Sequence, residues 1–450
     1  MYLLPPSLDE WLPEGHLAYF ILDVIERLDL SEIYASYGGD GRGQPPYEPS
    51  MMTALVLYAY SVGIASSRRI ERATFEDVAF RVLAANQHPD HDSISAFRKR
   101  HLKALAGLFV QVLKLCRQAG LVKLGHVALD STKVRANASR HKGMSYKRMK
   151  QKADELERQV AELLELAERV DAEEDAKYGK GVRGDELPEA LRHKESRLRK
   201  IQEAISALEE EARKDAEAAA EEGEQKVRQW EERSRGRAKN RRGKKPKVPN
   251  PADAKPEDRA QRNFTDPDSR IMKDSSKSFQ QCYNAQAAVD EAHQIIVGCH
   301  VTQCAADQAE LVPLVELIEA NTKELPGLLT ADAGYFSEQN VTFLEDKSIE
   351  AYVAVEKIKH GEQPVLVRGR PPKDMSPKQR MRRKLLTKRG QSVYAKRKTT
   401  AEPVFGQMKQ ARGLRQFLLR GLENVSSEWD LWGMSHNLLK LYRYGTLPAV

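Results

Sequence analysis

Residues 126–133 read HVALDSTK, and this stretch decides the fold because it joins a short apolar run to a carboxylate. The apolar residues predict a strand with Asp130 at its C-terminal tip. Residues 327–334, GLLTADAG, repeat the pattern and place Asp332 at the end of a second strand. Functional side chains gather at the carboxyl ends of strands in α/β sheets. We therefore expect Asp130 and Asp332 to converge across neighbouring strands.

The segments around these two strands predict an α/β fold. Strand patterns recur at residues 282–290 and 294–301, and the short connector between them fits a β-hairpin. A helical pattern follows at residues 306–321, and a further strand at residues 351–355. The order strand, insertion, two strands, helix, strand, helix, strand, helix indicates a mixed sheet with covering helices.

Residues 1–120 predict an all-α domain that precedes the sheet. Apolar residues at helical spacing over residues 17–28 form one buried stripe. Further helices are expected over residues 51–62, opened by Pro49, and over residues 66–83.

One part of this helical domain has the layout of a helix-turn-helix. A turn over residues 86–90 separates two short helices, and residues 92–95 can cap the second. That second helix carries Arg98, Lys99, Arg100 and His101. The layout predicts binding to DNA ends, but small helical domains without that role look alike, so a purely structural role stays the alternative.

A long helical insertion is predicted between the first strand and the rest of the sheet. Residues 141–225 contain two arms in which apolar residues recur alternately about four and three positions apart. Glycine and proline residues interrupt the helical pattern at residues 179–188, so the two arms predict an antiparallel coiled-coil hairpin. The apolar positions are Leu156, Val160, Leu163, Ala167 and Val170 in one arm, and Leu191, Leu198, Ile201, Ile205 and Leu208 in the other. Residues 226–262 are expected to form a flexible basic linker. The α/β domain then comprises residues 121–140 and 263–450.

The charge pattern favours a polyanionic partner through its distribution rather than its total. Lys and Arg number 73 against 65 Asp and Glu, giving a net charge of +8. Residues 233–247 hold nine cations and no acid, and residues 368–398 hold about a dozen cations with one aspartate. A solvated linker explains either run alone, whereas two runs flanking the carboxylates favour contact with phosphates.

The sequence also indicates a compartment. No apolar run reaches membrane-spanning length, and the N-terminus lacks the segments of a signal peptide, so a cytoplasmic protein is expected. Four scattered cysteines are too few for a disulfide framework. Cys299, His300 and Cys304 have no second ligand pair of matching spacing, which argues against a zinc site.

Glu402 supplies a third carboxylate for a metal site. Pro403 fits the first turn of a helix, so Glu402 would stand at its N-terminal entry, facing the sheet. Cleavage of a phosphodiester needs charge neutralisation and an activated nucleophile, and a pair of divalent ions provides both. Three acidic residues without a His or Cys cluster favour Mg²⁺ or Mn²⁺. The sequence therefore predicts that Asp130, Asp332 and Glu402 hold two such ions.

Other acidic residues have structural explanations. Asp290 ends a strand, and Asp307 opens a helix, where capping accounts for it. Asp266 and Asp268 lie in a turn. These four residues are therefore left out of the predicted metal site.

Three segments, residues 127–133, 329–335 and 394–409, resemble the motifs of DDE transposases of bacterial insertion sequences, which use an RNase H-like catalytic fold. The family pattern near the glutamate is Tyr, two residues, Arg, three residues, Glu, six residues, Lys. The residues that fit it are Tyr394, Arg397, Glu402 and Lys409. Four residues separate Arg397 from Glu402, however, and Lys398 occupies the expected spacing. The pattern leaves open which of these two cations faces the substrate.

The resemblance implies a DNA transposase that cuts at transposon ends and joins the freed 3′-hydroxyl to target DNA. It implies double-stranded DNA as partner and a homo-oligomer that brings two ends together. Arg397, Lys398 and Lys409 would bind backbone phosphates, and Tyr394 would pack on a sugar or base. Two alternatives stay open: a metal-dependent nuclease of the same fold, and a non-catalytic DNA-binding protein assembled through the coiled coil.

Overall fold

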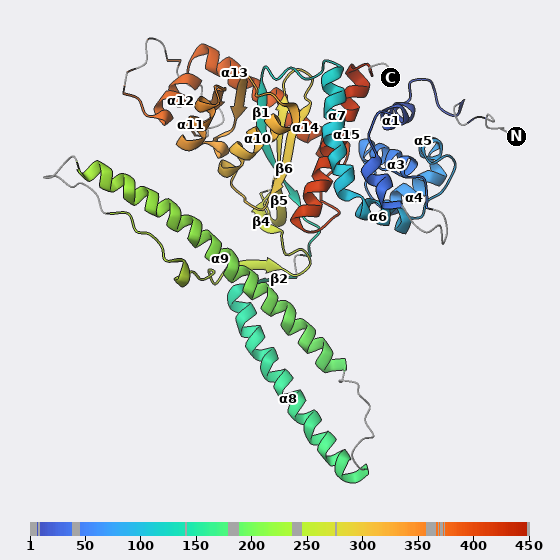
Figure 1. Cartoon of the computed structure of the whole chain (residues 1–450), viewed down its shortest axis with the longest axis vertical. Coiled ribbons are helices and arrows are strands. Elements are labelled where there is room, and N and C mark those ends of the chain that lie inside the picture. Colours follow the sequence, from blue (N-terminus) through green and yellow to red (C-terminus); the bar gives the residue numbers. More distant parts are fainter. Residues whose placement is uncertain are drawn as a thin grey trace. The chain divides into compact units, whose positions relative to one another are not determined.

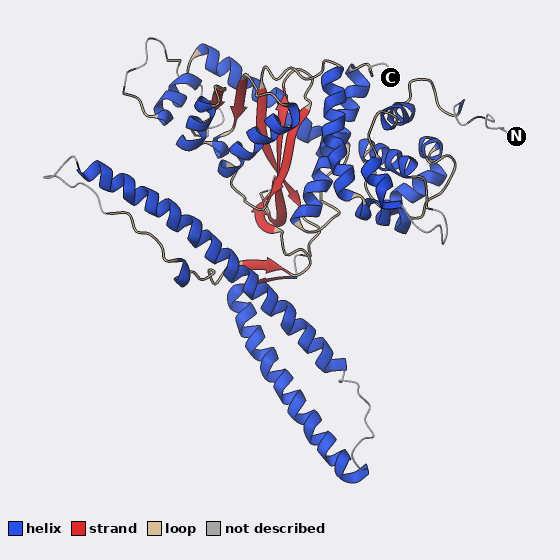
Figure 2. Cartoon of the chain, viewed as in Figure 1, coloured by secondary structure: helices blue, strands red, loops and turns tan. Residues whose placement is uncertain are grey.

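The computed structural model describes residues 7, 10–37, 46–139, 142–178, 189–235, 245–274, 277–356, 366, 367, 369, 372 and 374–447. The chain divides into two compact units. Unit 1 comprises Met1–Asn137 and Ser269–Val450, and unit 2 comprises Ala138–Asp268. Figure 2 shows that unit 1 combines strands and helices, whereas two long helices dominate unit 2.

The N-terminal part of unit 1 is helical, as predicted (Figure 1). Its helices are α1 (Leu17–Ile25), α2 (Ser31–Tyr34), α3 (Pro49–Ser61), α4 (Ser67–Glu76), α5 (Val78–Leu83), α6 (His91–Arg100) and α7 (Leu102–Gln118), with a 3-10 turn, η2 (Ala35–Tyr37), after α2. Pro49 begins α3, as expected. Nearly every side chain of α3 is buried, so this helix forms the centre of the group.

Two predictions about these helices are wrong. The single helix expected over residues 66–83 is divided at Asp77, where the backbone is extended. The Asp77 carboxylate accepts a hydrogen bond from the N–H of Ala79 (2.8 Å) and so caps α5. The cap of α6 is Asp90, not residues 92–95.

Arg98 and His101 do not face outward as a helix-turn-helix contact to DNA would require. The Arg98 side chain is buried and donates a hydrogen bond to the carbonyl oxygen of Ala65 (2.6 Å). His101 is also buried. Only Lys99 and Arg100 of the four predicted residues are exposed, because the other two lie on the face of the helix that packs inward.

The sheet of unit 1 is mixed, as predicted. Its strands are β1 (Val127–Arg135), β4 (Arg270–Lys273), β5 (Phe279–Asp290), β6 (Ile296–Thr302), β7 (Leu328–Ala331) and β8 (Glu350–Val353). The strand order is β4-β5-β1-β7-β8, with β6 also paired to β5. β1 is antiparallel to β5 and parallel to β7, which is parallel to β8. The predicted hairpin of β5 and β6 is confirmed.

Strand β1 is longer than predicted. The expected strand ended at Asp130, but β1 continues to Arg135 and pairs with β5 along its whole length. Asp130 therefore lies within a strand, opposite Ala287, and not at a strand tip. The polar residues 131–133 stay in the sheet because their partner strand runs alongside them and can satisfy their backbone groups.

Helices cover both faces of this sheet. They are η5 (Gln308–Glu310), α10 (Leu311–Thr322), η6 (Ala333–Tyr335), α11 (Glu338–Asp346), α12 (Pro377–Leu385), α13 (Lys388–Thr400), α14 (Glu402–Gly406), the π-helical η7 (Gln407–Ala411) and α15 (Leu422–Tyr444). A Cβ on Gly298 of β6 would lie 3.5 Å from Leu317 on α10. The next residue, Cys299, points the other way, and its sulfur lies 3.2 Å from the Cβ position of Gly433 on α15. Thus α10 and α15 lie on opposite faces.

The N-terminal helices and the sheet form one compact unit, whereas the sequence suggested a boundary near residue 120. Helix α7 packs along α15, and the two approach closely at Gly433, where a Cβ would be 3.3 Å from the ring of Phe109. On α15, Trp429 is fully buried, and its indole N–H donates to the carbonyl oxygen of Gln286 on β5 (2.9 Å). Helix α15 therefore joins both parts through buried apolar surface.

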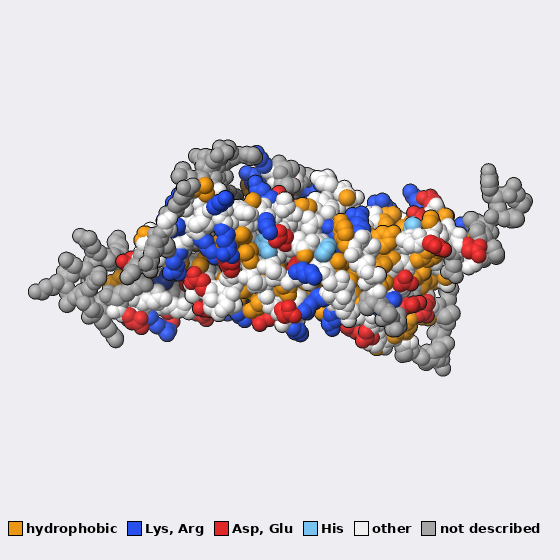
Figure 3. Space-filling view, turned by 90° about the horizontal axis from the view of Figure 1, so that it is seen from above, with side chains coloured by type: hydrophobic (Ala, Val, Ile, Leu, Met, Phe, Trp, Pro, Cys, Tyr) orange, Lys and Arg blue, Asp and Glu red, His pale blue; other side chains and the backbone are white. Residues whose placement is uncertain are grey.

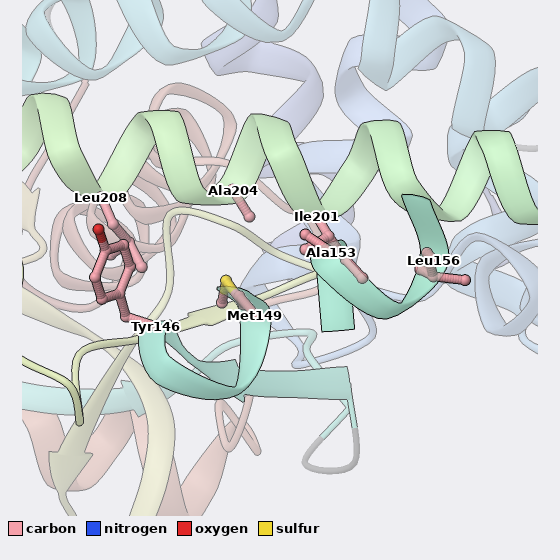
Figure 4. Packing of buried hydrophobic residues seen from close by; sticks show 7 residues of the cluster. All are labelled: Tyr146, Met149, Ala153, Leu156, Ile201, Ala204 and Leu208. Carbon is pink, nitrogen blue, oxygen red and sulfur yellow. The ribbon is translucent and has the colours of Figure 1, made fainter. Parts of the chain in front are cut away.

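Unit 2 contains two long helices, α8 (Tyr146–Tyr178) and α9 (Glu189–Arg235), and a small sheet of β2 (Gly143–Ser145) and β3 (Gln261–Asn263). The helices bury a common apolar cluster, formed by Tyr146, Met149, Ala153 and Leu156 of α8 and Ile201, Ala204 and Leu208 of α9 (Figure 4). Leu156, Ile201 and Leu208 are among the positions that the apolar spacing predicted. The interruption predicted at residues 179–188 lies outside the described residues.

The segment predicted as a linker, residues 226–262, is partly helical, because α9 continues to Arg235. Beyond it, a short turn, η4 (Pro251–Asp253), also contacts α9. Residues 236–244, which hold much of the first basic run, lie outside the described residues. Among the described helices, none has the length and apolar character that a membrane span requires.

Candidate active site

Asp130 and Asp332 are brought together by the pairing of β1 with β7. These parallel strands place Ala128 beside Thr330. Two residues further on, the same register sets Asp130 beside Asp332 on one face, because side chains two residues apart share a face. Asp332 follows β7 directly, as predicted, and its carboxylate accepts a hydrogen bond from the N–H of Gly334 (2.8 Å). Adjacent strands are about 4.8 Å apart, so the two carboxylates are close neighbours.

Arg397, on α13, links the first aspartate to the glutamate. Its Nη1 lies 3.0 Å from Oδ2 of Asp130, and its Nη2 lies 3.7 Å from Oε1 of Glu402. Glu402 begins α14 with Pro403 in the first turn, as predicted. The spacing in the sequence leaves open whether Arg397 or Lys398 faces the substrate. Arg397 is the one that faces the carboxylates, and Lys398 is exposed.

The electrostatics of the site favour bound positive charge. Burial raises the pKa of Asp130 to about 6; Arg397 lowers it, and the charges of Asp332 and Glu402 raise it further. Burial lowers the pKa of Arg397, but the surrounding carboxylates outweigh that effect, so its pKa is raised. The three carboxylates therefore act on one another and on one shared guanidinium.

The oxygen ligands suit a hard divalent cation, provided that Arg397 moves. Among the described residues, no three His, Cys, Asp or Glu side chains are placed to hold one ion. Arg397 instead pairs with both Asp130 and Glu402. The Glu402 side chain is 52% exposed, which leaves it free to turn toward the aspartates. Carboxylates without a His or Cys partner fit Mg²⁺ or Mn²⁺ chemistry.

The other residues predicted to contact DNA lie at three different places. Tyr394 borders the carboxylates: its ring centre is 5.9 Å from the guanidinium carbon of Arg397, and burial raises its pKa. Lys409, on η7, donates a hydrogen bond to the carbonyl oxygen of Lys133 on β1 (2.9 Å), and burial lowers its pKa. Lys398 is exposed and makes no ion pair within the part of the chain that the structure describes.

Several cations of the basic run at residues 368–398 already have acidic partners. The pairs are Arg380 with Glu345 (3.3 Å), Arg382 with Glu356 (2.9 Å), Arg389 with Glu350 (2.6 Å) and Lys396 with Glu291 (2.8 Å). Figure 3 shows Lys and Arg side chains gathered on one half of a face, with Asp and Glu side chains among them. Exposed pairs of this kind are weak, so a polyanion can compete for these cations.

Asp307 is a candidate functional residue that the sequence did not reveal. The predicted capping role is wrong, because its side chain makes no capping hydrogen bond to η5. Its Oδ1 instead accepts hydrogen bonds from Asn284 (2.7 Å) and Gln286 (2.8 Å) on β5. Asp290, by contrast, is structural as predicted, since its carboxylate accepts a hydrogen bond from the N–H of Leu124 (2.7 Å).

Two protein-family models match the chain. The first, described as Transposase domain (DUF772), matches residues 6–100. The second, described as Transposase DDE domain, matches residues 259–438, a range that contains Asp332 and Glu402 but not Asp130. No curated protein and no solved structure matches the chain.

A mixed sheet bearing neighbouring carboxylates, together with two transposase matches over separate parts of the sequence, points to a transposase. The mixed α/β sheet is consistent with an RNase H-like catalytic fold. The two matches are consistent with a DDE transposase of an insertion sequence.

Proposed function

We propose that the chain cuts DNA at transposon ends and transfers the freed 3′ ends into target DNA. Asp130, Asp332 and Glu402 would hold two Mg²⁺ or Mn²⁺ ions. When bound, such ions neutralise the phosphate and activate the attacking oxygen. The observation that carries this proposal is the parallel pairing of β1 with β7, which sets the two aspartates side by side, with Glu402 linked to Asp130 through Arg397.

On this proposal Arg397 has two positions. Beside Asp130 its guanidinium offsets the charge of the crowded carboxylates, which lowers the pKa of Asp130. Once released, it can bind a backbone phosphate through two parallel hydrogen bonds, a geometry that suits arginine. Lys398 is exposed nearby in sequence and is available for a neighbouring phosphate. Tyr394 borders Arg397 and can pack on a sugar or base.

The helical domain would hold the DNA end through exposed cations on α4 and α6. These are Arg68, Arg69 and Arg72 on α4, and Lys99 and Arg100 on α6. None of them makes an ion pair within the described residues, so no acidic side chain has to be displaced when a phosphate binds. Phe75, on α4, is 58% exposed and adds an aromatic surface.

Asp332→Asn tests the assignment in a cleavage assay on labelled duplex that carries the inverted repeats flanking the gene, with Mg²⁺ present. We expect cleavage to fall to background because the substitution removes a proposed metal ligand. DNA binding should be retained, because Asp332 is not among the residues proposed to contact DNA. Asp346→Asn is the matched control, since Asp346 is exposed at the end of α11 and should keep full activity. Undiminished cleavage by Asp332→Asn rules out this site.

The same assay separates the alternatives. Strand-transfer products indicate a transposase, and cleavage without them indicates a nuclease. Binding without metal and without nicking, weakened steeply by salt, indicates a non-catalytic DNA-binding protein. Transposition joins two DNA ends, so the active complex on DNA is expected to contain at least two copies of the chain, which its mass in light scattering would show.

A further inference from the structure

We propose that Asp307 is a positioning residue for Asp332: it holds the η6 turn so that the Asp332 carboxylate points toward its partner carboxylates. Asp307 directly precedes η5, a different segment of the chain from the strand that leads into Asp332. This inference rests on the proposed function, since it takes Asp332 as a metal ligand.

One oxygen of Asp307 receives three donors. Its Oδ1 accepts hydrogen bonds from Nδ2 of Asn284 (2.7 Å) and Nε2 of Gln286 (2.8 Å), and lies 3.4 Å from Nζ of Lys133. Asn284 and Gln286 are fully buried, and the Asp307 side chain is 14% exposed. Buried donors on rigid strands fix the position of this carboxylate.

The other oxygen of Asp307 abuts the turn that carries Asp332. A Cβ on Gly334 would lie 3.0 Å from Oδ2 of Asp307 and 3.0 Å from Oδ1 of Asp332. Both carboxylate oxygens therefore lie on the side of Gly334 that a Cβ would occupy, and its N–H donates to Oδ1 of Asp332 (2.8 Å). A shift of Asp307 would move the residue that orients Asp332.

A second connection holds the same turn. The hydroxyl of Tyr335 donates a hydrogen bond to Oε1 of Gln286, whose amide N–H donates to Asp307. Tyr335 is fully buried. Two consecutive residues of the turn, Gly334 and Tyr335, are therefore braced by the Asp307 network.

Asp307 acts through this turn and not as a fourth ligand beside Asp130. Lys133 lies opposite Asn284 in the pairing of β1 with β5, and both side chains reach Asp307. Asp130 lies three residues before Lys133 on the same strand, so its side chain points to the other face of the sheet. Asp307 and Asp130 consequently lie on opposite faces.

The test uses the full-length chain and measures Mn²⁺ binding by isothermal titration calorimetry without DNA. We expect Asp307→Asn to raise the Kd for Mn²⁺ about 10–100-fold, as loss of a residue that orients a metal ligand does. Cleavage should then need correspondingly more Mn²⁺, with DNA affinity unchanged. Glu316→Gln is the matched control, since Glu316 is exposed on α10; it should leave both values unchanged.

Gly334→Ala provides a second route if Asp307→Asn does not fold. Its added Cβ crowds both carboxylates, so the Kd for Mn²⁺ should rise, and the two substitutions together should be non-additive. An unchanged Kd for Mn²⁺ in the folded variants overturns the inference. So does a titration in which fewer molecules bind Mn²⁺ but those that bind do so with the wild-type Kd. Should Asp332→Asn keep its activity, the proposed metal site itself fails. If Asp332→Asn is inactive but Asp307→Asn binds Mn²⁺ as the wild type does, the proposed metal site stands and only the positioning role of Asp307 is refuted.

Discussion

Replacing Asp130 by Asn is expected to stabilise the metal-free protein while it abolishes metal-dependent cleavage. Burial raises the pKa of Asp130 from 3.8 to about 6, so the folded state binds a proton more readily than the unfolded chain does. Above pH 6 Asp130 is ionised in both states, and its burial then lowers the free energy of unfolding by the full penalty that the pKa difference sets. As the pH falls from 6 toward 3.8, this penalty disappears, because the folded state takes up the proton first. Asn carries no charge and avoids the penalty at every pH.

The size of the effect follows from the two pKa values. A pKa difference of about two corresponds to about 3 kcal/mol of unfolding free energy at pH 8. The attraction of Arg397 is already contained in this figure, because the guanidinium lowers the same pKa. Asp130 is only 15% exposed, so solvent screening is limited. At pH 4.5 the gain should shrink to about 1 kcal/mol.

Urea unfolding in EDTA, followed by tryptophan fluorescence at pH 8 and pH 4.5, measures this difference. Trp429 and Trp432 lie in the same unit as Asp130 and report its unfolding. The exposed Asp346→Asn variant should match the wild type at both pH values. A lower free energy of unfolding for Asp130→Asn at pH 8, or an equal gain at both pH values, would refute the reasoning.

Three further predictions concern the helical part of unit 1. Gly63→Ala should lower the free energy of unfolding by about 2–5 kcal/mol, because φ is +80° and the new Cβ would lie 2.5 Å from the carbonyl oxygen of Arg412; Gly120→Ala, with φ +72° and open space around it, should cost only about 1 kcal/mol in the same urea titration. Arg98→Ala should cost about 2–3 kcal/mol through its lost buried hydrogen bonds, with the exposed Lys99→Ala near zero, and equal stabilities would contradict the structural role of Arg98. Arg68→Ala with Arg72→Ala should weaken DNA binding and reduce the slope of log affinity against log salt by about 2, whereas Lys103→Ala, whose lysine pairs with Glu423, should leave that slope nearly unchanged.

The features predicted correctly from sequence are those that neighbouring residues control. Asp332 ends a strand because an apolar run stops there, and Pro49 and Pro403 mark helix starts because their fixed φ suits a first turn. The β5–β6 hairpin was visible as two apolar runs joined by a short connector.

Three of the incorrect predictions share one cause, which is that a distant segment decides the local outcome. The polar residues after Asp130 stay in β1 because β5 runs beside them. The burial of Arg98 depends on a carbonyl oxygen more than thirty residues earlier in the chain. Asp307 had a plausible local role as a helix cap, but donors from β5 compete for its carboxylate and are better placed.

The sequence by itself determined the candidate acidic residues, the order of most strands and helices, and the resemblance to DDE transposases, because these follow from residue type and short-range spacing. Only the tertiary structure decided that Arg397 and not Lys398 faces the carboxylates, since adjacent residues of one helix point about 100° apart and only packing selects the inward one. It also decided that Asp130 and Asp332 are neighbours, because the register of two parallel strands far apart in the chain is set by the sheet they share.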